Sequence, residues 1–185
     1  QALELLPADY WRWYLTAYGP EHSDSAFTWE QFQSAINKDL ADVLGNFVNR
    51  IVKFTESKFG GVVPEGGALT DEDRAFETQI NAAVAEATAA FEAMEFRKAS
   101  QAIRAAWVLG NEYLQVAAPW TAFKTDPERA ATAVRFALNL VAVFARLAAP
   151  ILPFTAPKIA ASVGETDLGW PSQGEDWLAR VPVGR

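Results

Sequence analysis

Apolar residues recur at helical spacing between residues 28 and 60. They follow one another mostly at intervals of three and four: Ile36, Leu40, Val43, Leu44, Phe47, Ile51 and Phe54. This spacing places them on one face of an α-helix. Thr28, with Gln31 three positions later, has the signature of a capping box, and Gly60-Gly61 marks the end. The pattern predicts a long helix with one buried face.

Two polar residues lie at the edge of that face. Asn46 and Arg50 are one helical turn apart, about a quarter turn from the middle of the apolar face. Neighbouring side chains can hold such a pair rigidly while it still reaches a ligand. Polar residues at this position also cap helices, contact water or bridge to another helix. The pattern alone leaves a binding role and a structural role open.

The rest of the chain is also patterned as helices. The predicted helices cover residues 7–19, 70–94, 96–117 and 127–149, and a shorter one covers 153–163. Residues 118–125 are predicted to form a short link, and residues 164–185 lose the helical period and are predicted to form an irregular arm. Strands are not expected, because no stretch alternates apolar and polar residues between hairpin turns. The predicted fold is all-α, a bundle of about five helices with short connections.

Composition narrows the classes of function. A chain of 185 residues with 50% hydrophobic content can bury one sizeable core, so one main domain is expected. The absence of cysteine excludes disulfides and thiol catalysis. A net charge of −7 argues against broad, nonspecific binding to nucleic acid, because there is no excess of cations to displace counterions. A nucleic-acid function would therefore depend on a local site.

The longest apolar stretch, FALNLVAVFARLAAPILPF, is interrupted by Asn139, Arg146, Pro150 and Pro153. No signal peptide and no membrane span are therefore expected. The chain starts with Gln1 rather than Met, which is most simply explained if it is a piece of a longer protein.

The residues needed for most catalytic sites are missing. His22 is the only histidine and is predicted to lie in a loop, so neither a Ser-His-Asp triad nor a histidine metal site is expected. The many carboxylates fall on predicted exposed helix faces and first turns, where solvation and capping explain them. No cofactor, no metal ion and no self-contained enzyme activity are predicted for these residues.

The segment Ala118-Pro119-Trp120 is the second place with unusual side chains. Pro119 cannot continue a helix and biases Ala118 away from helical angles, so Trp120 is expected at a helix end rather than inside a helix. A tryptophan can stack on a base, and Asn and Arg can hydrogen-bond base edges, which together suit the reading of unpaired nucleotides. Alternatively, Trp120 closes the end of the bundle.

Four segments together resemble one protein family. They are DYWRWYLTAYGPEHSDSAFTWEQF, a helix with GNFVNR, EFRKASQAIRAAWVLGNEYLQVAAPW and ILPFTAPKI. In this order they resemble the carboxyl-terminal, anticodon-binding part of methionyl-tRNA synthetase, a class I aminoacyl-tRNA synthetase, over roughly residues 8 to 160. The resemblance implies a connecting segment over residues 1–27 and an anticodon-binding helical bundle over residues 28–163, with the irregular arm at 164–185 after it.

The same resemblance implies roles for particular residues. Asn46 and Arg50 would hydrogen-bond anticodon base edges, Trp120 would stack on an anticodon base, and Pro119 would shape the turn. Some members have Asn where this chain has Asp42, and an acid where it has Gln115.

Those two differences leave the full set of hydrogen bonds open. Asp42 and Gln115 are possible additional RNA contacts, together with Asn49 and Asn111. Arg104 is a further candidate on the helix that carries Asn111, where a binding role and a structural role are not separable from sequence.

The parent enzyme implied by the resemblance is cytoplasmic and ligates methionine to its tRNA with ATP and Mg²⁺. Its His-x-Gly-His and Lys-Met-Ser-Lys-Ser types of motif are absent here, where Met94 is the only methionine. This chain would recognise the anticodon loop of methionine tRNA and adjoin the catalytic domain that precedes it. Two alternatives are a helical protein-interaction or structural module and the anticodon bundle of a valine, isoleucine or leucine synthetase.

Overall fold

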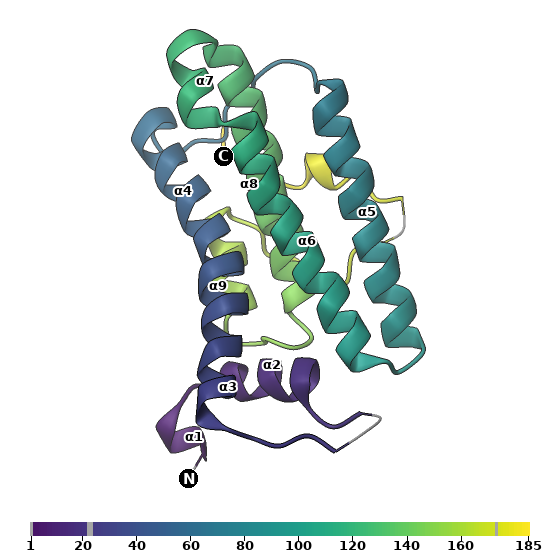
Figure 1. Ribbon diagram of the computed structural model, residues 1–185. Coiled ribbons are helices and arrows are strands. Elements are labelled where there is room, and N and C mark those ends of the chain that lie inside the picture. Colours follow the sequence, from purple (N-terminus) through teal and green to yellow (C-terminus); the bar gives the residue numbers. More distant parts are fainter. Residues whose placement is uncertain (1, 22–23, 173) are drawn as a thin grey trace.

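A computed structural model of the protein describes residues 2–21, 24–172 and 174–185, so the predictions for Gln1 and His22 lie outside the described residues. The described chain is helical and contains no strand, which confirms the predicted all-α fold (Figure 1). Its elements in order are α1 (Ala2–Leu5), α2 (Ala8–Tyr18), α3 (Trp29–Ala35), η1 (Ile36–Gly45), α4 (Asn46–Phe59), α5 (Asp71–Glu92), α6 (Phe96–Ala117), α7 (Pro119–Thr125), α8 (Pro127–Ala148), α9 (Ala156–Ser162) and η2 (Trp177–Ala179).

Helix α8 is the centre of the bundle. Its residues from Ala130 to Ala148 are buried, except the half-buried Arg135, because α4, α5, α6 and α9 all pack against it. A helix that is apolar on every side has to be enclosed in this way. α8 is long and apolar enough to cross a membrane, but 94% of its most apolar window is buried inside the fold. That degree of burial is typical of a core helix.

The predicted long helix is continuous but not uniform. It consists of α3, η1 and α4 in succession, and the Thr28 side chain accepts a hydrogen bond from the Gln31 N–H as predicted. η1 is a π-helix, so the prediction of one regular α-helix was wrong for residues 36–45. A π-helix has more residues per turn than an α-helix, and apolar residues spaced three and four apart fit both. The predicted apolar face is buried or partly buried along its whole length.

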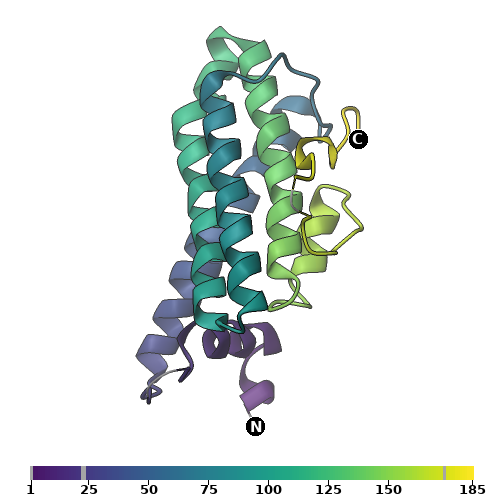
Figure 2. The same ribbon diagram turned by 90° about the vertical axis from the view of Figure 1, so that its right-hand side faces the viewer.

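Helices α5 and α6 form an antiparallel pair beside α8 (Figures 1 and 2). α5 starts with a capping box between Thr70 and Asp73, in which each side chain bonds the other residue's main-chain N–H. α6 approaches α4 and α8 closely at Gly110. A Cβ atom there would lie 2.6 Å from the Phe144 ring and 3.0 Å from the Phe47 ring. The absence of a side chain at Gly110 therefore sets how closely α6 packs.

The segment predicted to be a link between α6 and α8 is helix α7. Ala118 has the left-handed conformation, with φ 38° and ψ 57°, and α6 ends there. Pro119 is the first residue of α7, a position that suits proline because no N–H is needed there. Trp120 therefore lies in the first turn of a new helix, so it is at a helix end as expected, whereas the prediction that residues 118–125 form only a link was wrong. Figure 1 shows α7 beside the end of α4.

Helix α2 crosses the end of the bundle farthest from α7 (Figure 1). The buried carboxylate of Asp39, in η1, connects it to two other elements. Asp39 accepts hydrogen bonds from Trp13 Nε1 at 3.0 Å and from the Tyr18 hydroxyl at 2.7 Å, both in α2. It also accepts one from the Arg104 guanidinium in α6. Residues of the expected connecting segment are thus joined to the bundle by a shared buried acceptor.

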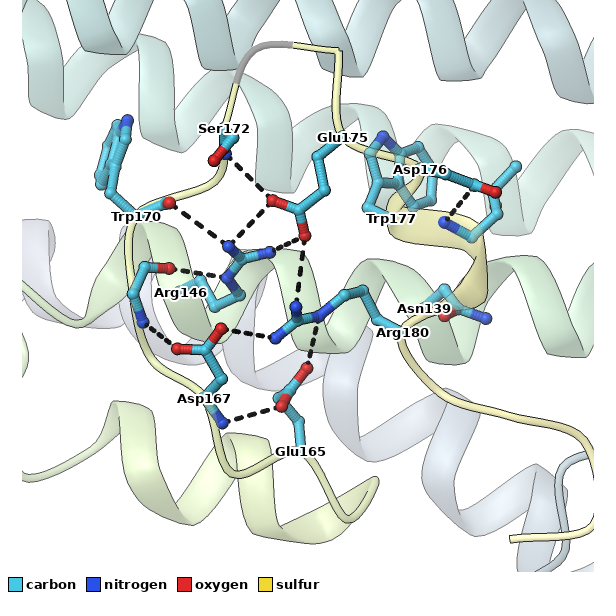
Figure 3. Close-up of polar contacts among 12 residues, drawn as sticks. Asn139, Arg146, Glu165, Asp167, Trp170, Ser172, Glu175, Asp176, Trp177 and Arg180 are labelled. Carbon is cyan, nitrogen blue, oxygen red and sulfur yellow. Dashed lines mark hydrogen bonds and ion pairs between the residues drawn. The ribbon is translucent and has the colours of Figure 1, made fainter.

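The carboxyl-terminal arm is irregular apart from the short 3₁₀ helix η2 and lies along α8 and α9 (Figure 2). Trp170 and Trp177 each donate an indole N–H to a residue of α5, at 2.9 and 2.8 Å. The buried Arg146 of α8 donates to the Gly169 carbonyl and to the Glu175 carboxylate (Figure 3). The arm is therefore packed on the bundle as an integral part of the described fold.

Candidate nucleic-acid interface

Arg50 of α4 and Trp120 of α7 lie against each other. The guanidinium carbon of Arg50 is 4.4 Å from the centroid of the Trp120 ring, and both side chains are half-buried. A guanidinium over an indole face at this distance is a cation–π contact. Phe54, one turn after Arg50, meets the Trp120 ring edge-on at 6.3 Å. The structure thus brings together two residues that sequence analysis selected separately.

Asn46 lies one turn before Arg50 and is exposed. Its side-chain nitrogen donates a hydrogen bond to Oδ1 of Asn111 in α6, at 3.0 Å. Asn111 is half-buried, and its own nitrogen donates to the main-chain carbonyls of Val43 at 2.9 Å and Trp107 at 3.1 Å. Asn111, a candidate RNA contact in the sequence, therefore lies behind Asn46 and is fully engaged with protein groups.

The other candidates occupy different surroundings. Asp42 and Gln115 are exposed on η1 and α6. Asn49 is exposed too, but it lines an apolar groove between the long helix and α9, together with Val48 and Ile159. Asn49 is thus placed beside this groove, whereas Asn46 bonds to α6.

Arg104 lies two turns before Asn111 on α6. Its guanidinium pairs with the buried Asp39, at the end of the bundle where α2 docks. The structure therefore gives Arg104 a packing role between α2, η1 and α6, away from Trp120.

An aromatic cluster that sequence analysis missed supports Trp120. The rings of Phe54, Phe59 and Phe123 contact one another edge-on, with centroids 5.4 to 6.2 Å apart, and join α4 to α7. The Lys58 ammonium lies 5.9 Å from the Phe123 ring. The only signal in the sequence was an aromatic residue at the centre of the supposed link, at Phe123.

The arrangement offers three kinds of contact on one surface. Trp120 has a flat ring for stacking, Arg50 carries a positive charge and several N–H donors, and Asn46 has an amide that both donates and accepts. The parts of the chain that the structure describes contain no group of three or more His, Cys, Asp or Glu side chains placed to hold a metal ion. Such contacts are suited to binding unpaired bases.

Comparison with known proteins identifies two matching family models. The model described as the anticodon binding domain of methionyl tRNA ligase matches residues 63–185, and the model described as class I tRNA synthetases (M) matches residues 1–52. Among curated relatives, methionine–tRNA ligase from Caulobacter vibrioides (strain NA1000 / CB15N) is 59% identical over 186 residues, which cover all of this chain and 33% of the relative. That from Caulobacter sp. (strain K31) is 56% identical over 188 residues, 99% of this chain and 32% of the relative.

A solved structure has the same fold. The free-state crystal structure of Mycobacterium tuberculosis methionyl-tRNA synthetase matches 99% of this chain with a TM-score of 0.88 and 26% sequence identity, over 37% of its own length. The chain thus spans about a third of the length of the relatives that it matches. The match of the anticodon-binding family model over most of the chain shows that it belongs to the family of methionyl-tRNA ligase anticodon-binding domains.

Proposed function

We propose that this chain recognises the anticodon of methionine tRNA as part of a longer methionine–tRNA ligase. The observation that carries this proposal is the contact between Arg50 and Trp120, with Asn46 one turn away, in a chain of this family. Trp120 stacks on an unpaired anticodon base, while Asn46 and Arg50 hydrogen-bond base edges. Pro119 starts α7 and so holds Trp120 at its amino end.

The whole enzyme joins methionine to its tRNA in the cytoplasm and uses ATP and Mg²⁺ for this reaction. These ligands bind the catalytic part, which precedes this chain. Contacts to a few unpaired bases need less cationic surface than binding along a duplex does. The acidic net charge of the chain is therefore compatible with this function.

The surface around α1 to α3 fits a contact with that catalytic part. Several large apolar side chains are exposed there: Leu3, Leu5, Leu15, Phe27 and Trp29. Exposed apolar groups gathered at one end of a domain are typical of an interface. We infer that they pack against the preceding part of the same polypeptide, which accounts for the aromatic surface without a separate partner protein.

The site is tested with Trp120→Ala in the full-length protein. Losing one base stack weakens the charging of methionine tRNA by about 1 to 3 kcal/mol in transition-state free energy. Methionine activation without tRNA stays unchanged, because it takes place in the catalytic part. Phe96→Ala is the matched control, since Phe96 is a 43% exposed aromatic at the other end of α6. Unchanged charging in Trp120→Ala would contradict the proposal, whereas equal loss of charging and activation would indicate a folding defect.

A second experiment tests anticodon recognition against a protein-interaction role. Fluorescence anisotropy compares the binding of a stem-loop with the methionine anticodon and of loops with one anticodon base changed. We expect the methionine loop to bind tightest. Equal affinity for every loop would favour the interaction module.

A further inference from the structure

The amide of Asn111 has a fixed orientation. Its nitrogen faces two main-chain carbonyls, those of Val43 at 2.9 Å and Trp107 at 3.1 Å. A carbonyl oxygen can only accept, so the nitrogen side of the amide has to face these two atoms. Both N–H groups of Asn111 are thereby used, and its oxygen faces Asn46.

The oxygen of Asn111 in turn fixes the amide of Asn46. Because this oxygen only accepts, Asn46 has to turn its nitrogen towards it, and the two atoms are 3.0 Å apart. Asn46 makes no other side-chain hydrogen bond to the described residues, and it is exposed. Its oxygen and its second N–H are therefore available to a ligand at two defined positions.

The main chain of η1 anchors the same arrangement. The Val43 carbonyl, which accepts from Asn111, also accepts from the main-chain N–H of Asn46. The backbone and the side chain of Asn46 are therefore both positioned from one carbonyl of the π-helix. Rotation of either amide would set two donors or two acceptors against each other.

The order of donor and acceptor on an amide decides which bases it can pair with. Cytosine and adenine present an amino donor beside a ring-nitrogen acceptor, whereas uracil and guanine present a carbonyl acceptor beside a ring N–H donor. An amide that rotates freely can pair with either class of base, because a rotation of about 180° exchanges its donor and its acceptor. An amide held in one orientation pairs well with only one class.

We propose that Asn111 is a positioning residue that fixes the amide of Asn46, so that Asn46 distinguishes amino bases from keto bases at one anticodon position. This inference rests on the proposed function. Asn111 itself does not contact the RNA, because both of its N–H groups and its oxygen are bonded to protein groups.

The test uses four anticodon stem-loops and the full-length protein. One loop carries the methionine anticodon CAU, and each of the others exchanges one base between the classes, giving UAU, CGU and CAC. For each anticodon position, anisotropy gives the ratio of the affinity for CAU to the affinity for the loop changed at that position. This ratio is measured for the wild type, Asn46→Ala, Asn111→Ala and the double variant. Asn81→Ala is the control, since Asn81 also makes a side-chain hydrogen bond, to Trp177, on another helix.

We expect Asn46→Ala to lower the ratio at one position, by about threefold to tenfold for a lost hydrogen bond. Asn111→Ala lowers the ratio at the same position, and the double variant loses no more than Asn46→Ala alone. Asn81→Ala changes no ratio. Asn111→Asp keeps an acceptor for Asn46, so it retains more of the ratio than Asn111→Ala although it loses both donors to the carbonyls.

Three outcomes would overturn the positioning role. They are an unchanged ratio in Asn111→Ala, additive losses in the double variant, and Asn111→Asp ranking below Asn111→Ala. The last order is expected if Asn111 acts only through its bonds to the two carbonyls, because a carboxylate repels them. If Trp120→Ala and Asn46→Ala also left the binding of every loop unchanged, the proposed function itself would fail. Thermal unfolding of each variant identifies any that does not fold, and Asn111→Asp then replaces Asn111→Ala.

Discussion

The guanidinium of Arg50 covers one face of the Trp120 ring, with its central carbon 4.4 Å from the ring centroid. A base that stacks on that face has to displace the guanidinium or extend the stack. If the stack is extended, Arg50 lies next to the bound base, and its planar set of donors is directed by the contact with Trp120. The pair therefore links stacking to hydrogen bonding.

Arg50→Lys is predicted to weaken binding of the methionine anticodon loop by about 1 to 3 kcal/mol, because an ammonium cannot replace a planar fork that stacks and bonds a base edge. The free energy of unfolding falls by only about 1 kcal/mol or less, as expected for a partly exposed cation–π contact. Anisotropy and urea unfolding measure the two effects. Lys53→Ala removes an exposed cation on the groove side of α4 and serves as control. Unchanged binding in Arg50→Lys beside weaker binding in Lys53→Ala would show that only charge matters.

Asp73 of α5 is completely buried beside Arg129 of α8. The guanidinium contacts both carboxylate oxygens, at 3.0 and 2.8 Å, and the hydroxyl of Tyr113 in α6 adds a bond of 2.8 Å. Arg129→Met leaves a buried charge without its cation, so the free energy of unfolding should fall by about 3 to 5 kcal/mol. Urea unfolding measures this loss. Adding Asp73→Asn should recover part of it, and no recovery would contradict the charge-pair explanation.

The same carboxylate predicts sensitivity to acid. Burial alone would raise the pKa of Asp73, but hydrogen bonds from the Thr70 N–H, Tyr113 and Arg129 outweigh it and lower that pKa below its usual value. The folded state therefore binds this proton less readily than the unfolded state. The stabilisation is complete above the unfolded pKa of about 4 and is lost as the pH falls through the folded pKa. Asp73→Asn should flatten the stability curve in that acidic range, and an unchanged curve would contradict the assignment.

Arg146 is predicted to hold the carboxyl-terminal arm on the bundle. Its side chain is 4% exposed and bonds the Gly169 carbonyl and the Glu175 carboxylate (Figure 3). Arg146→Met keeps the length of the chain but removes these bonds. Amide hydrogen exchange should then accelerate in residues 165–181 while α5 and α6 stay protected. Uniform acceleration throughout the bundle would show instead that the arm and the core unfold together.

Acid should release the arm of the wild type in the same way. The Arg146 guanidinium lowers the pKa of Glu175. Burial alone would raise the pKa of Glu165, but hydrogen bonds from the Asp167 main-chain N–H and the Arg180 guanidinium outweigh it and lower that pKa. Both carboxylates stabilise the arm above the unfolded pKa of about 4.3, and this contribution is lost as the pH falls through their folded values. Exchange in the arm should therefore rise in acid before exchange in the core does. Fast exchange in the arm of the wild type already at neutral pH would contradict this order.

Local sequence patterns predicted the regular helices well. Helix α6 ends at residue 117, as predicted, and α5 and α8 each end within two residues of the predicted position. These ends are predictable because the spacing of apolar residues and the capping residues act over only one or two turns. The π-helix of residues 36–45 was not predicted, since its apolar spacing is compatible with an α-helix. α7 was missed because it is short, and Pro119 was taken only as a stop signal.

The site shows a different limit. Arg50 and Trp120 were each chosen from their own surroundings and from family resemblance, but no local pattern predicts a contact between residues so distant in the chain. The bond between Asn46 and Asn111 is also a product of how α6 packs against the long helix. Residue types indicated what the site can bind, whereas the partner that orients each side chain depends on tertiary packing.

Tyr18 gives a prediction at the opposite end of the pH scale. Its hydroxyl donates to Asp39 at 2.7 Å, and burial, together with this carboxylate, raises the pKa of Tyr18 to about 12. The folded state thus prefers the neutral phenol, whose contribution is complete below the unfolded pKa of about 10 and is lost as the pH rises through about 12. In Tyr18→Phe, an ultraviolet titration of tyrosinate should therefore lack the step near pH 12. The free energy of unfolding of this variant should also fall less than that of the wild type between about pH 10 and about pH 12. Parallel stability curves for the two proteins would show that the Asp39 contact does not hold the proton.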